Sequence, residues 1–331
     1  MMAKGSGWLQ ADSKACSNCH TAVKSISIVS GCFNEAENIT EFVSRVRATV
    51  ETLTEYSYEI IIIDNASTDG TQDILRRLAA REPRLKVIFN ARNFGAVRSG
   101  YHALLQARGD AVIAMASDLQ DPPELIGTFV KQWEKGHKVV LAIKSETHES
   151  KVLHLIRSAY YKAINRLADI ELNEHSTGFG LYDQEVVRIL RQINDPYPYA
   201  RGLIAEIGFE SAKVPFTQPR RKRGLTKNNF YTLYDLAMLG FTSHSKIPLR
   251  LATMLGFSMS LCSFLVAVAY FIYKLIFWYS FPVGQAPIVI GLFLFSSVQL
   301  FFIGIVGEYI GAIHTQVLRR PLVVEKERIN F

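Results

Sequence analysis

Two long segments near the C-terminal end carry no charged residue, and they constrain the fold of this 331-residue chain more than any other feature. Leu251–Tyr273 contains 23 residues and Ala286–Gly307 contains 22, without an Asp, Glu, Lys or Arg. A helix of that length crosses the roughly 30 Å hydrocarbon core of a bilayer at ~1.5 Å per residue. Buried helices of soluble proteins seldom lack charge over such a length, so we expect a membrane-spanning helical hairpin.

The charges that flank this hairpin predict its orientation. Arg250 precedes the first segment, Arg319 and Arg320 follow the second, and the connector at 278–285 has no Lys or Arg. Basic residues favour the cytoplasmic side of a membrane, so the N-terminal domain and the C-terminal tail are both expected in the cytoplasm. The sequence therefore predicts an integral membrane protein.

Upstream of the hairpin, short apolar runs rich in β-formers alternate with amphipathic segments. The runs lie at Ile26–Phe33, Tyr58–Ile63, Leu85–Phe89, Ala111–Met115 and Val139–Ile143. Between the first two, six apolar residues share one helical face: Ile39, Phe42, Val43, Val46, Val50 and Leu53. Strands that are apolar on both faces and separated by helices are typical of a mostly parallel sheet in an α/β layer fold.

The overall composition restricts both the class of protein and the kind of molecule that the chain could bind. A hydrophobic content of 49% with 20% charged residues excludes a disordered chain, and four Cys exclude a disulfide scaffold. The net charge of +7 favours a partner that carries phosphate: a nucleotide, a nucleic acid or an anionic lipid.

Three polar loops follow predicted strands at their carboxyl ends. Asn34-Glu35 follows the first strand, residues 64–71 follow the second, and residues 117–124 follow the fourth. Ligands of open α/β sheets bind beyond the carboxyl ends of the strands. One such loop is more often a helix cap, but three at strand ends predict a binding site. Neither G-x-x-x-x-G-K-[ST] nor G-x-G-x-x-G occurs, which disfavours an ATPase or a dehydrogenase.

The residue types in these loops suit a nucleotide diphosphate. The carboxylates of Asp64 and Glu35 can accept hydrogen bonds from a base and a ribose. Asp118, with Gln120 beside it, is the best candidate ligand for a divalent cation that neutralises a diphosphate. The Arg92-Asn93 pair, after the third strand, can reach the leaving phosphates or the sugar.

Two further segments suggest contact with a membrane surface. A helix with a basic face is expected at Lys151–Ala168, and five Lys and Arg residues lie between 220 and 227. Apolar residues then recur at helical spacing from Phe230 to Phe241. This pattern predicts docking on a membrane, although a core helix behind a solvated loop has the same pattern. The predicted order is a flexible tail (1–24), an α/β domain (25–218), a basic loop with an interfacial helix (219–248), two transmembrane helices (249–317) and a C-terminal tail (318–331).

The order of these motifs resembles family-2 glycosyltransferases of the dolichol-phosphate mannose synthase type. The resemblance rests on Phe33-Asn34-Glu35, Asp64-x-x-Ser67-x-Asp69-Gly70-Thr71, Arg92-Asn93-x-Gly95, Asp118-Leu119-Gln120-Asp121-Pro122-Pro123-Glu124 and Arg221-x-x-Gly224-x-Thr226-Lys227. With the C-terminal hairpin added, the chain resembles the bacterial polyprenyl-phosphate (bactoprenol) glucosyltransferases. The resemblance implies a GT-A fold and an inverting transfer of a sugar, with glucose from UDP-glucose the first expectation, to polyprenyl phosphate.

The resemblance also implies roles for individual residues. The nucleotide donor would be bound by Phe33, Asn34, Glu35, Asp64, Asn65, Ser67, Arg92 and Asn93. The acceptor phosphate would be bound by Lys144, Arg157, Arg221, Thr226 and Lys227. Asp118 and Gln120 would be the catalytic residues and would hold Mg²⁺ or Mn²⁺. The implied partners are a nucleotide sugar, polyprenyl phosphate, the lipid bilayer of a bacterial plasma membrane and further copies of the chain in a homo-oligomer, with no nucleic acid.

The chain departs from the family pattern at two places. Ala116-Ser117-Asp118 stands where the family has D-x-D, and Gly178-Phe179-Gly180 stands where it has D-F-R. We therefore expect a metal that is held more weakly, or held by donor oxygens and water, with Glu206 or Asp183 as candidate substitutes for the missing carboxylates. These departures leave open a second hypothesis, a membrane scaffold that binds a nucleotide sugar without turnover. A processive polysaccharide synthase is disfavoured because no Q-x-x-R-W element occurs.

Overall fold

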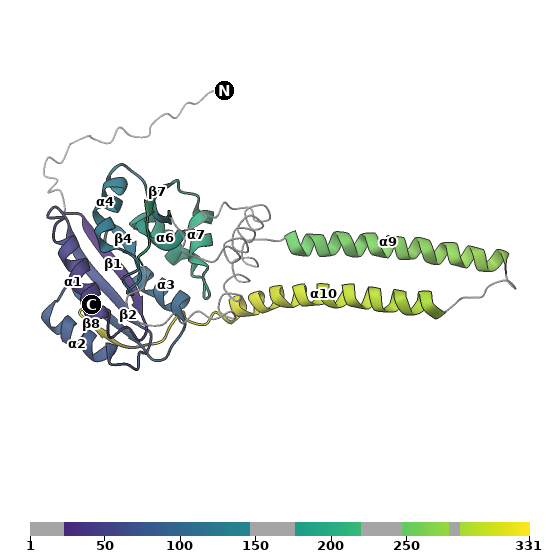
Figure 1. Cartoon of the computed structure of the whole chain (residues 1–331), viewed down its shortest axis with the longest axis horizontal. Coiled ribbons are helices and arrows are strands. Elements are labelled where there is room, and N and C mark those ends of the chain that lie inside the picture. Colours follow the sequence, from purple (N-terminus) through teal and green to yellow (C-terminus); the bar gives the residue numbers. More distant parts are fainter. Residues whose placement is uncertain (1–22, 146–175, 220–246, 278–284) are drawn as a thin grey trace, which may run out of the picture.

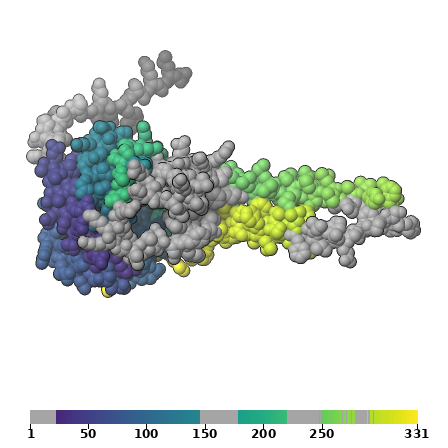
Figure 2. All heavy atoms as spheres, viewed as in Figure 1, coloured from purple at the N-terminus to yellow at the C-terminus, as the bar shows by residue number. Residues whose placement is uncertain are grey.

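A computed structural model of the chain describes residues 23–145, 176–219, 247–277 and 285–331. An eight-stranded sheet forms the centre of an α/β domain, and two long helices project from that domain (Figures 1 and 2). The strands are β1 (Ser25–Cys32), β2 (Ser57–Asp64), β3 (Leu85–Asn90), β4 (Ala111–Ala114), β5 (Val139–Lys144), β6 (Ser176–Asp183), β7 (Ser211–Phe216) and β8 (Glu325–Ile329). Their order across the sheet is β7-β5-β6-β4-β1-β2-β3-β8.

The pairing of the strands confirms the predicted α/β fold. β1 lies parallel to β2 and to β4, β2 lies parallel to β3, and β5 lies parallel to β7. β6 is antiparallel to both β4 and β5, and β8 is antiparallel to β3. The five strands that the apolar runs predicted are β1 to β5. The sheet is therefore mixed but mostly parallel.

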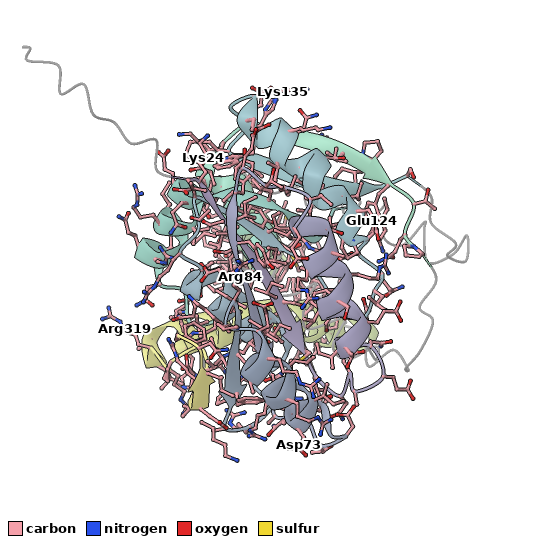
Figure 3. All side chains as sticks on the ribbon, turned by 90° about the vertical axis from the view of Figure 1, so that its left-hand side faces the viewer. Lys24, Asp73, Arg84, Glu124, Lys135 and Arg319 are labelled. Atoms are coloured by element: carbon pink, nitrogen blue, oxygen red, sulfur yellow. The ribbon has the colours of Figure 1, made fainter. Side chains whose placement is uncertain are left out.

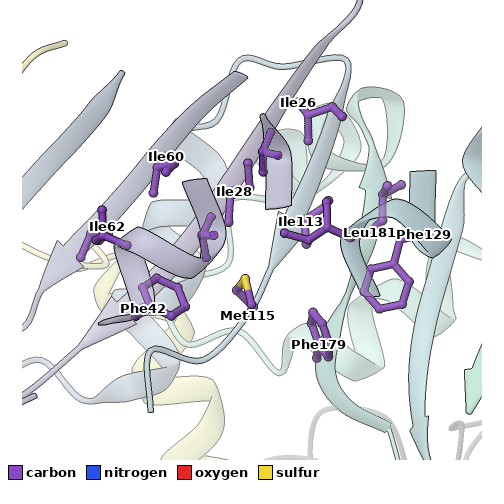
Figure 4. Packing of buried hydrophobic residues seen from close by; sticks show 14 of the residues in the cluster. Ile26, Ile28, Phe42, Ile60, Ile62, Ile113, Met115, Phe129, Phe179 and Leu181 are labelled. Atoms are coloured by element: carbon purple, nitrogen blue, oxygen red, sulfur yellow. The ribbon is translucent and has the colours of Figure 1, made fainter. Parts of the chain in front are cut away.

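Helices cover both faces of the sheet. They are α1 (Ile39–Val50), α2 (Thr71–Arg81), α3 (Ala96–Gln106), the short 3₁₀ turn η1 (Pro123–Leu125), α4 (Ile126–Glu134), α6 (Gln184–Ile193) and α7 (Ala200–Ile207). The apolar faces of α1, α2 and α4 pack on one side of the sheet, in a core cluster that runs from Phe42 past Met115 to Phe179 and Phe129 (Figure 4). Those of α3, α6 and α7 pack on the other side. The result is a three-layer α/β/α arrangement.

The first helix follows its predicted apolar face closely. All five predicted residues from Ile39 to Val50 are buried in α1. The helix ends at Val50, so the prediction that Leu53 belongs to it was wrong. Leu53 still packs against the core from the turn that follows, because its amide bonds back to the carbonyl of Val50.

Two helices at the C-terminal end form the hairpin that the uncharged segments predicted. α9 (Ile247–Ile276) and α10 (Gln285–Leu318) run side by side away from the domain (Figure 1). By length and composition, Leu249–Tyr273 and Leu294–Leu318 can each cross a membrane, and their side chains are not buried within the protein. α10 continues beyond Gly307 to Leu318, so the second helix is longer than its uncharged part.

The segment after the hairpin is more than the simple tail expected at 318–331. It returns to the sheet as β8, which becomes the edge strand beside β3 (Figure 1). An ion pair joins Glu327 of this strand to Arg76 at 2.9 Å, and Glu325 Oε1 lies at hydrogen-bonding distance, 2.6 Å, from His102 Nε2. Asn330 Nδ2 donates to the carbonyls of Ala79 and Leu85 at 2.9 and 2.8 Å. Its charged residues gave no strand signal, yet charged side chains are common on edge strands.

Candidate functional site

The predicted polar loops meet at one edge of the sheet. β1, β2, β3 and β4 are parallel. The ends of β1, β2 and β3 are level, because Cys32 pairs with Asp64 and Asp64 pairs with Phe89, whereas β4 ends at Ala114, beside Val29 of β1. β5 points the same way, since it and β4 are both antiparallel to β6. The residues that follow these strands therefore lie along a common rim, as is usual for ligand sites of open α/β sheets.

Hydrogen bonds join the first polar loop to the second. The backbone N–H of Asn34 donates to Ser67 Oγ at 2.8 Å, and the N–H of Thr68 donates to Asn34 Oδ1 at 2.8 Å. Asn34 has a left-handed φ of 55°, which asparagine tolerates better than most residues. These bonds place the donor candidates Asn34 and Ser67 in direct contact.

Asp64 is completely buried between these loops. One carboxylate oxygen accepts from the backbone N–H of Ser67 at 3.0 Å and from Gln72 Nε2 at 2.8 Å. The other faces Cys32 Sγ at 3.7 Å. Burial, and then the Asp64 carboxylate, raise the pKa of Cys32 well above its ordinary value, so this cysteine remains a thiol. The contacts orient the Asp64 carboxylate before any ligand is present.

Glu35 is held where two helices begin. Its backbone N–H donates to Thr71 Oγ1 at 3.0 Å, at the first residue of α2. Its carboxylate accepts from Asn38 Nδ2 at 2.6 Å, and its carbonyl accepts from the Asn38 N–H at 3.0 Å, at the start of α1. Asn38 and Thr71 were not predicted as site residues. Phe33, the remaining donor candidate of this loop, is half-buried beside them.

Asn65 connects the second polar loop to the loop that follows β3 (residues 91–95). We call that loop the third polar loop, and residues 117–124 the loop after β4. Asn65 Oδ1 accepts from Asn90 Nδ2 at 3.1 Å and from the backbone N–H of Phe94 at 2.9 Å. Asn65 Nδ2 donates to Asn93 Oδ1 at 2.8 Å. Sequence reasoning missed Asn90, although a polar residue at the buried end of an apolar strand was a usable signal. Asn65 and Asn93, both donor candidates, are therefore brought together.

Arg92 lies at the outer end of this third loop. Its guanidinium Cζ is 4.0 Å from the centroid of the Phe94 ring, and Nη1 donates to the carbonyl of Asn93 at 3.0 Å. The side chain is exposed.

The loop after β4 is tightly organised around Asp121. Asp121 Oδ2 accepts from the backbone N–H of Ala116 at 2.8 Å, and burial raises the pKa of Asp121 to about 6. The N–H of Gln120 donates to Asp118 Oδ1 at 3.1 Å across Leu119, whose φ is 62°. Asp121 was part of the recognised motif but had no predicted role, and its burial shows that it supports the loop.

Two contacts connect this loop to its surroundings. Ser117 Oγ donates to the carbonyl of Gly31 at 3.0 Å, which ties it to the end of β1. Gln120 Nε2 donates to the carbonyl of Pro219 at 3.4 Å. Pro219 is the last described residue before residue 220, where the basic segment of the sequence begins.

The acceptor-phosphate candidates are only partly described. Lys144 ends β5 at the common rim, and its charge acts on Asp121 by lowering that carboxyl's pKa, against the larger effect of burial. Arg157, Arg221, Thr226 and Lys227 lie outside the described residues, as does the helix expected at Lys151–Ala168.

The departures at Gly178 and Gly180 have structural causes. A Cβ atom at Gly180 would lie 2.4 Å from the carbonyl oxygen of Val140 on the neighbouring strand. Gly178 has a φ of +90°, which other residues rarely adopt. The expectation that Asp183 could replace a missing carboxylate was wrong. Asp183 pairs with Ala111 at the opposite end of β4, where it caps α6 and accepts from Trp133 Nε1 at 2.7 Å.

Among the described residues no group of three metal-binding side chains occurs. Asp118 is a half-buried carboxylate whose Oδ1 already accepts one backbone N–H, and Gln120, with one side-chain oxygen, follows two residues later in the same loop. Mg²⁺ is often bound by one or two carboxylates together with substrate phosphates and water. This donor set fits such an ion only when a phosphate substrate supplies further oxygens.

The chain is similar to known glycosyltransferases over most of its length. Residues 27–190 match the family model for glycosyl transferase family 2. The chain is 33% identical over 304 residues to an SfII prophage-derived bactoprenol glucosyl transferase of Shigella flexneri, covering 91% of this chain and 97% of that protein. It is 31% identical over 299 residues to the uncharacterized glycosyltransferase YkcC of Bacillus subtilis, covering 90% and 92%. A solved mannosyltransferase from Pyrobaculum calidifontis, in complex with GDP-Man and Mn²⁺, is 18% identical with a TM-score of 0.45, covering 66% of this chain and 61% of that chain.

Proposed function

The chain belongs to glycosyl transferase family 2, and we propose that it transfers glucose from UDP-glucose to polyprenyl phosphate at a membrane surface, with inversion at the anomeric carbon. The observation that carries the proposal is the rim of cross-bonded polar loops on a domain that continues into two apolar helices. Relatives named bactoprenol glucosyl transferases match nearly the full length of the chain, which supports this acceptor.

The buried carboxylate of Asp64 and the loops around Asn34 and Asn65 would hold the nucleotide. Each is fixed by hydrogen bonds before a ligand arrives, so little ordering is left for the binding step. Asp118 and Gln120 would face the diphosphate. A divalent ion bound there with the donor would neutralise the charge that develops on the departing diphosphate.

The proposed transfer needs no general base. A phosphate monoester has a second pKa of ~6, so the acceptor oxygen is already anionic near pH 7. That oxygen forms a bond to the anomeric carbon while the bond from this carbon to the nucleotide diphosphate breaks. The protein would then contribute orientation and charge stabilisation. Lys144 and the basic segment that begins after Pro219 are the groups proposed to hold the acceptor phosphate.

The membrane arrangement is part of the proposal. Basic residues at both cytoplasmic flanks of the hairpin, Arg250 and Arg319-Arg320, support a catalytic domain on the cytoplasmic side of a bacterial plasma membrane. We include a homo-oligomer, because two spans bury little surface alone and glycines of α10 permit close helix contact. Crosslinking in intact membranes, followed by electrophoresis, tests this assembly.

The decisive experiment uses membranes that contain the full chain, polyprenyl phosphate and a panel of radiolabelled nucleotide sugars, with mass detection of the lipid product. We expect labelled lipid with UDP-glucose, and loss of it in Asp118→Asn. No labelled lipid with any donor, together with retained donor binding, would instead establish the scaffold that binds a nucleotide sugar without turnover. Labelling with a different donor would correct the sugar and leave the transferase standing.

A further inference from the structure

A cluster of arginines lies where α10 meets the catalytic domain. The guanidinium groups of Arg92 and Arg98 both lie near the ring of Phe94, with their Cζ atoms 4.0 and 5.5 Å from the ring centroid. Arg98 Nη2 donates to the carbonyl of Pro321 at 2.6 Å, directly after Arg320. We call Arg92, Arg98 and Arg320 the arginine cluster. They come from the third polar loop, from α3 and from the chain after α10, so only the folded protein assembles them.

No carboxylate neutralises this cluster within the part of the chain that the structure describes. The charged and titratable groups that act on Arg98 are Arg92, Arg320 and the hydroxyl of Tyr197. Burial, and then the neighbouring arginines, lower the pKa of Arg98. Its Nε is buried without a hydrogen-bond partner among the described residues. Three guanidinium groups gathered without an acid leave an excess of positive charge that an anion would stabilise.

Asp195, an acidic side chain beside the last turns of α10, is already engaged in hydrogen bonds. Asp195 Oδ1 accepts from Gln316 Nε2 at 2.8 Å and from the backbone N–H of Tyr197 at 2.9 Å. These bonds tie Asp195 to the last turns of α10, and Asp195 is not among the groups that act on Arg98.

The position of the cluster just after the end of α10 indicates its depth relative to a membrane. The apolar stretch that can cross a membrane ends at Leu318, and Arg320 follows two residues later. A span that ends there places the cluster at the level of lipid headgroups, where phosphate is the abundant anion. Arginine binds phosphate well, because its planar fork of donors matches two phosphate oxygens.

The cluster and Asp118 lie at different positions along the sheet, although Arg92 is also one of the donor candidates. Arg92 follows β3 and Asp118 follows β4, and the sheet order β4-β1-β2-β3 places three strand spacings between them. At ~4.8 Å per spacing, the two positions are about 14 Å apart across the sheet. A phosphate bound near Asp118 therefore lies well away from the loop that carries Arg92.

We propose that the arginine cluster binds the phosphate of an anionic phospholipid and thereby fixes the height of the catalytic domain on the bilayer. The proposal goes beyond sugar transfer and needs only the membrane placement of α9 and α10. The bound lipid would bridge the third polar loop, α3 and the end of α10, so that the donor site keeps one distance from the membrane surface.

The test is thermal melting of the full chain in neutral detergent, without nucleotide sugar or acceptor. Short-chain phosphatidylglycerol is titrated, with short-chain phosphatidylcholine, farnesyl phosphate and inorganic phosphate as separate arms. We expect phosphatidylglycerol to raise the Tm, and Arg98→Gln or Arg320→Gln to weaken its apparent affinity roughly tenfold, as expected for loss of one charged hydrogen-bonded pair. Arg319→Gln is the matched control, because Arg319 projects outward from the molecule and does not act on Arg98 (Figure 3).

Each other outcome overturns the proposal. Equal loss of affinity in Arg319→Gln would mean that surface charge alone attracts the lipid. A rise in Tm with farnesyl phosphate alone would assign the cluster to the acceptor, and equal protection by inorganic phosphate would mean an anion site that does not recognise lipid. Because Arg320 is exposed, its variant is expected to fold even if Arg98→Gln does not. Because the readout needs no turnover, failure of the transferase assay leaves this test unaffected.

Discussion

Replacing Asn65 with alanine is expected to separate the second polar loop from the third. Asn65 is 4% exposed, and its amide makes three hydrogen bonds in the site, to Asn90, Asn93 and Phe94. The variant leaves the Phe94 N–H without an acceptor. Asn90 Nδ2 keeps one of its two bonds, to Ser99 Oγ at 3.0 Å.

The loss of stability in Asn65→Ala is estimated from the hydrogen-bond donors that lose their acceptor. A buried donor without a partner costs about 1–3 kcal/mol. Phe94 is half-buried and Asn90 keeps one bond, so each loss falls at the low end of that range. We expect the free energy of unfolding to fall by about 2 kcal/mol, which corresponds to about 4–8 °C in Tm for a domain of this size. Donor affinity should fall as well, because Asn93 loses its anchor.

The measurements are a thermal melt of the full chain in detergent and the KM for the donor. Asn93→Ala is the control, because Asn93 is exposed and water can replace its side chain, so its Tm should change by less than half as much. An unchanged Tm in Asn65→Ala, or an equal change in both variants, would show that this hydrogen-bonded link does not stabilise the site.

Three further predictions test the packing, the C-terminal strand and the buried thiol. Gly180→Ala places a methyl group 2.4 Å from a backbone carbonyl oxygen and should lower the free energy of unfolding by about 1–3 kcal/mol, measured by thermal melting. Gly127→Ala, in a helix with open space around it, should not lower the free energy of unfolding. Equal Tm values for the two variants would contradict the close approach at Gly180. Burial opposes ionisation of Glu325, but hydrogen bonds from Arg328 hold the pKa of Glu325 below its ordinary value of 4.5. The ionised Glu325 therefore stabilises the fold above pH 4.5, and this stabilisation is lost as the pH falls through the lower pKa of the folded protein. Glu325→Gln should flatten the fall of Tm at acid pH, and an unchanged fall would refute this role of Glu325. Burial raises the pKa of Cys32, so peptide mapping should find it unmodified by iodoacetamide in the folded protein and modified after denaturation; rapid labelling of the folded protein would count against the buried thiol.

Much of this protein is determined by local sequence pattern. Strands β1 to β5 were predicted because each is a short apolar run bounded by polar residues, which favours a strand buried on both faces. The hairpin was predicted because a long uncharged segment is costly to expose to water. The polar loops at the rim were predicted for a related reason: a parallel sheet brings the carboxyl ends of its strands to one edge, whatever the side chains are.

Other features were decided by the tertiary structure alone. Nothing local marks residues 325–329 as a strand, since four of the five are charged, and β8 forms because β3 leaves an open edge for it. The reversed direction of β6, and the need for glycine at 180, depend on the strand placed beside it. The bond between His102 and Glu325 and the arginine cluster join residues more than two hundred positions apart. Such contacts gain their energy only when the folded chain brings both partners together, so no window of sequence contains the signal for them.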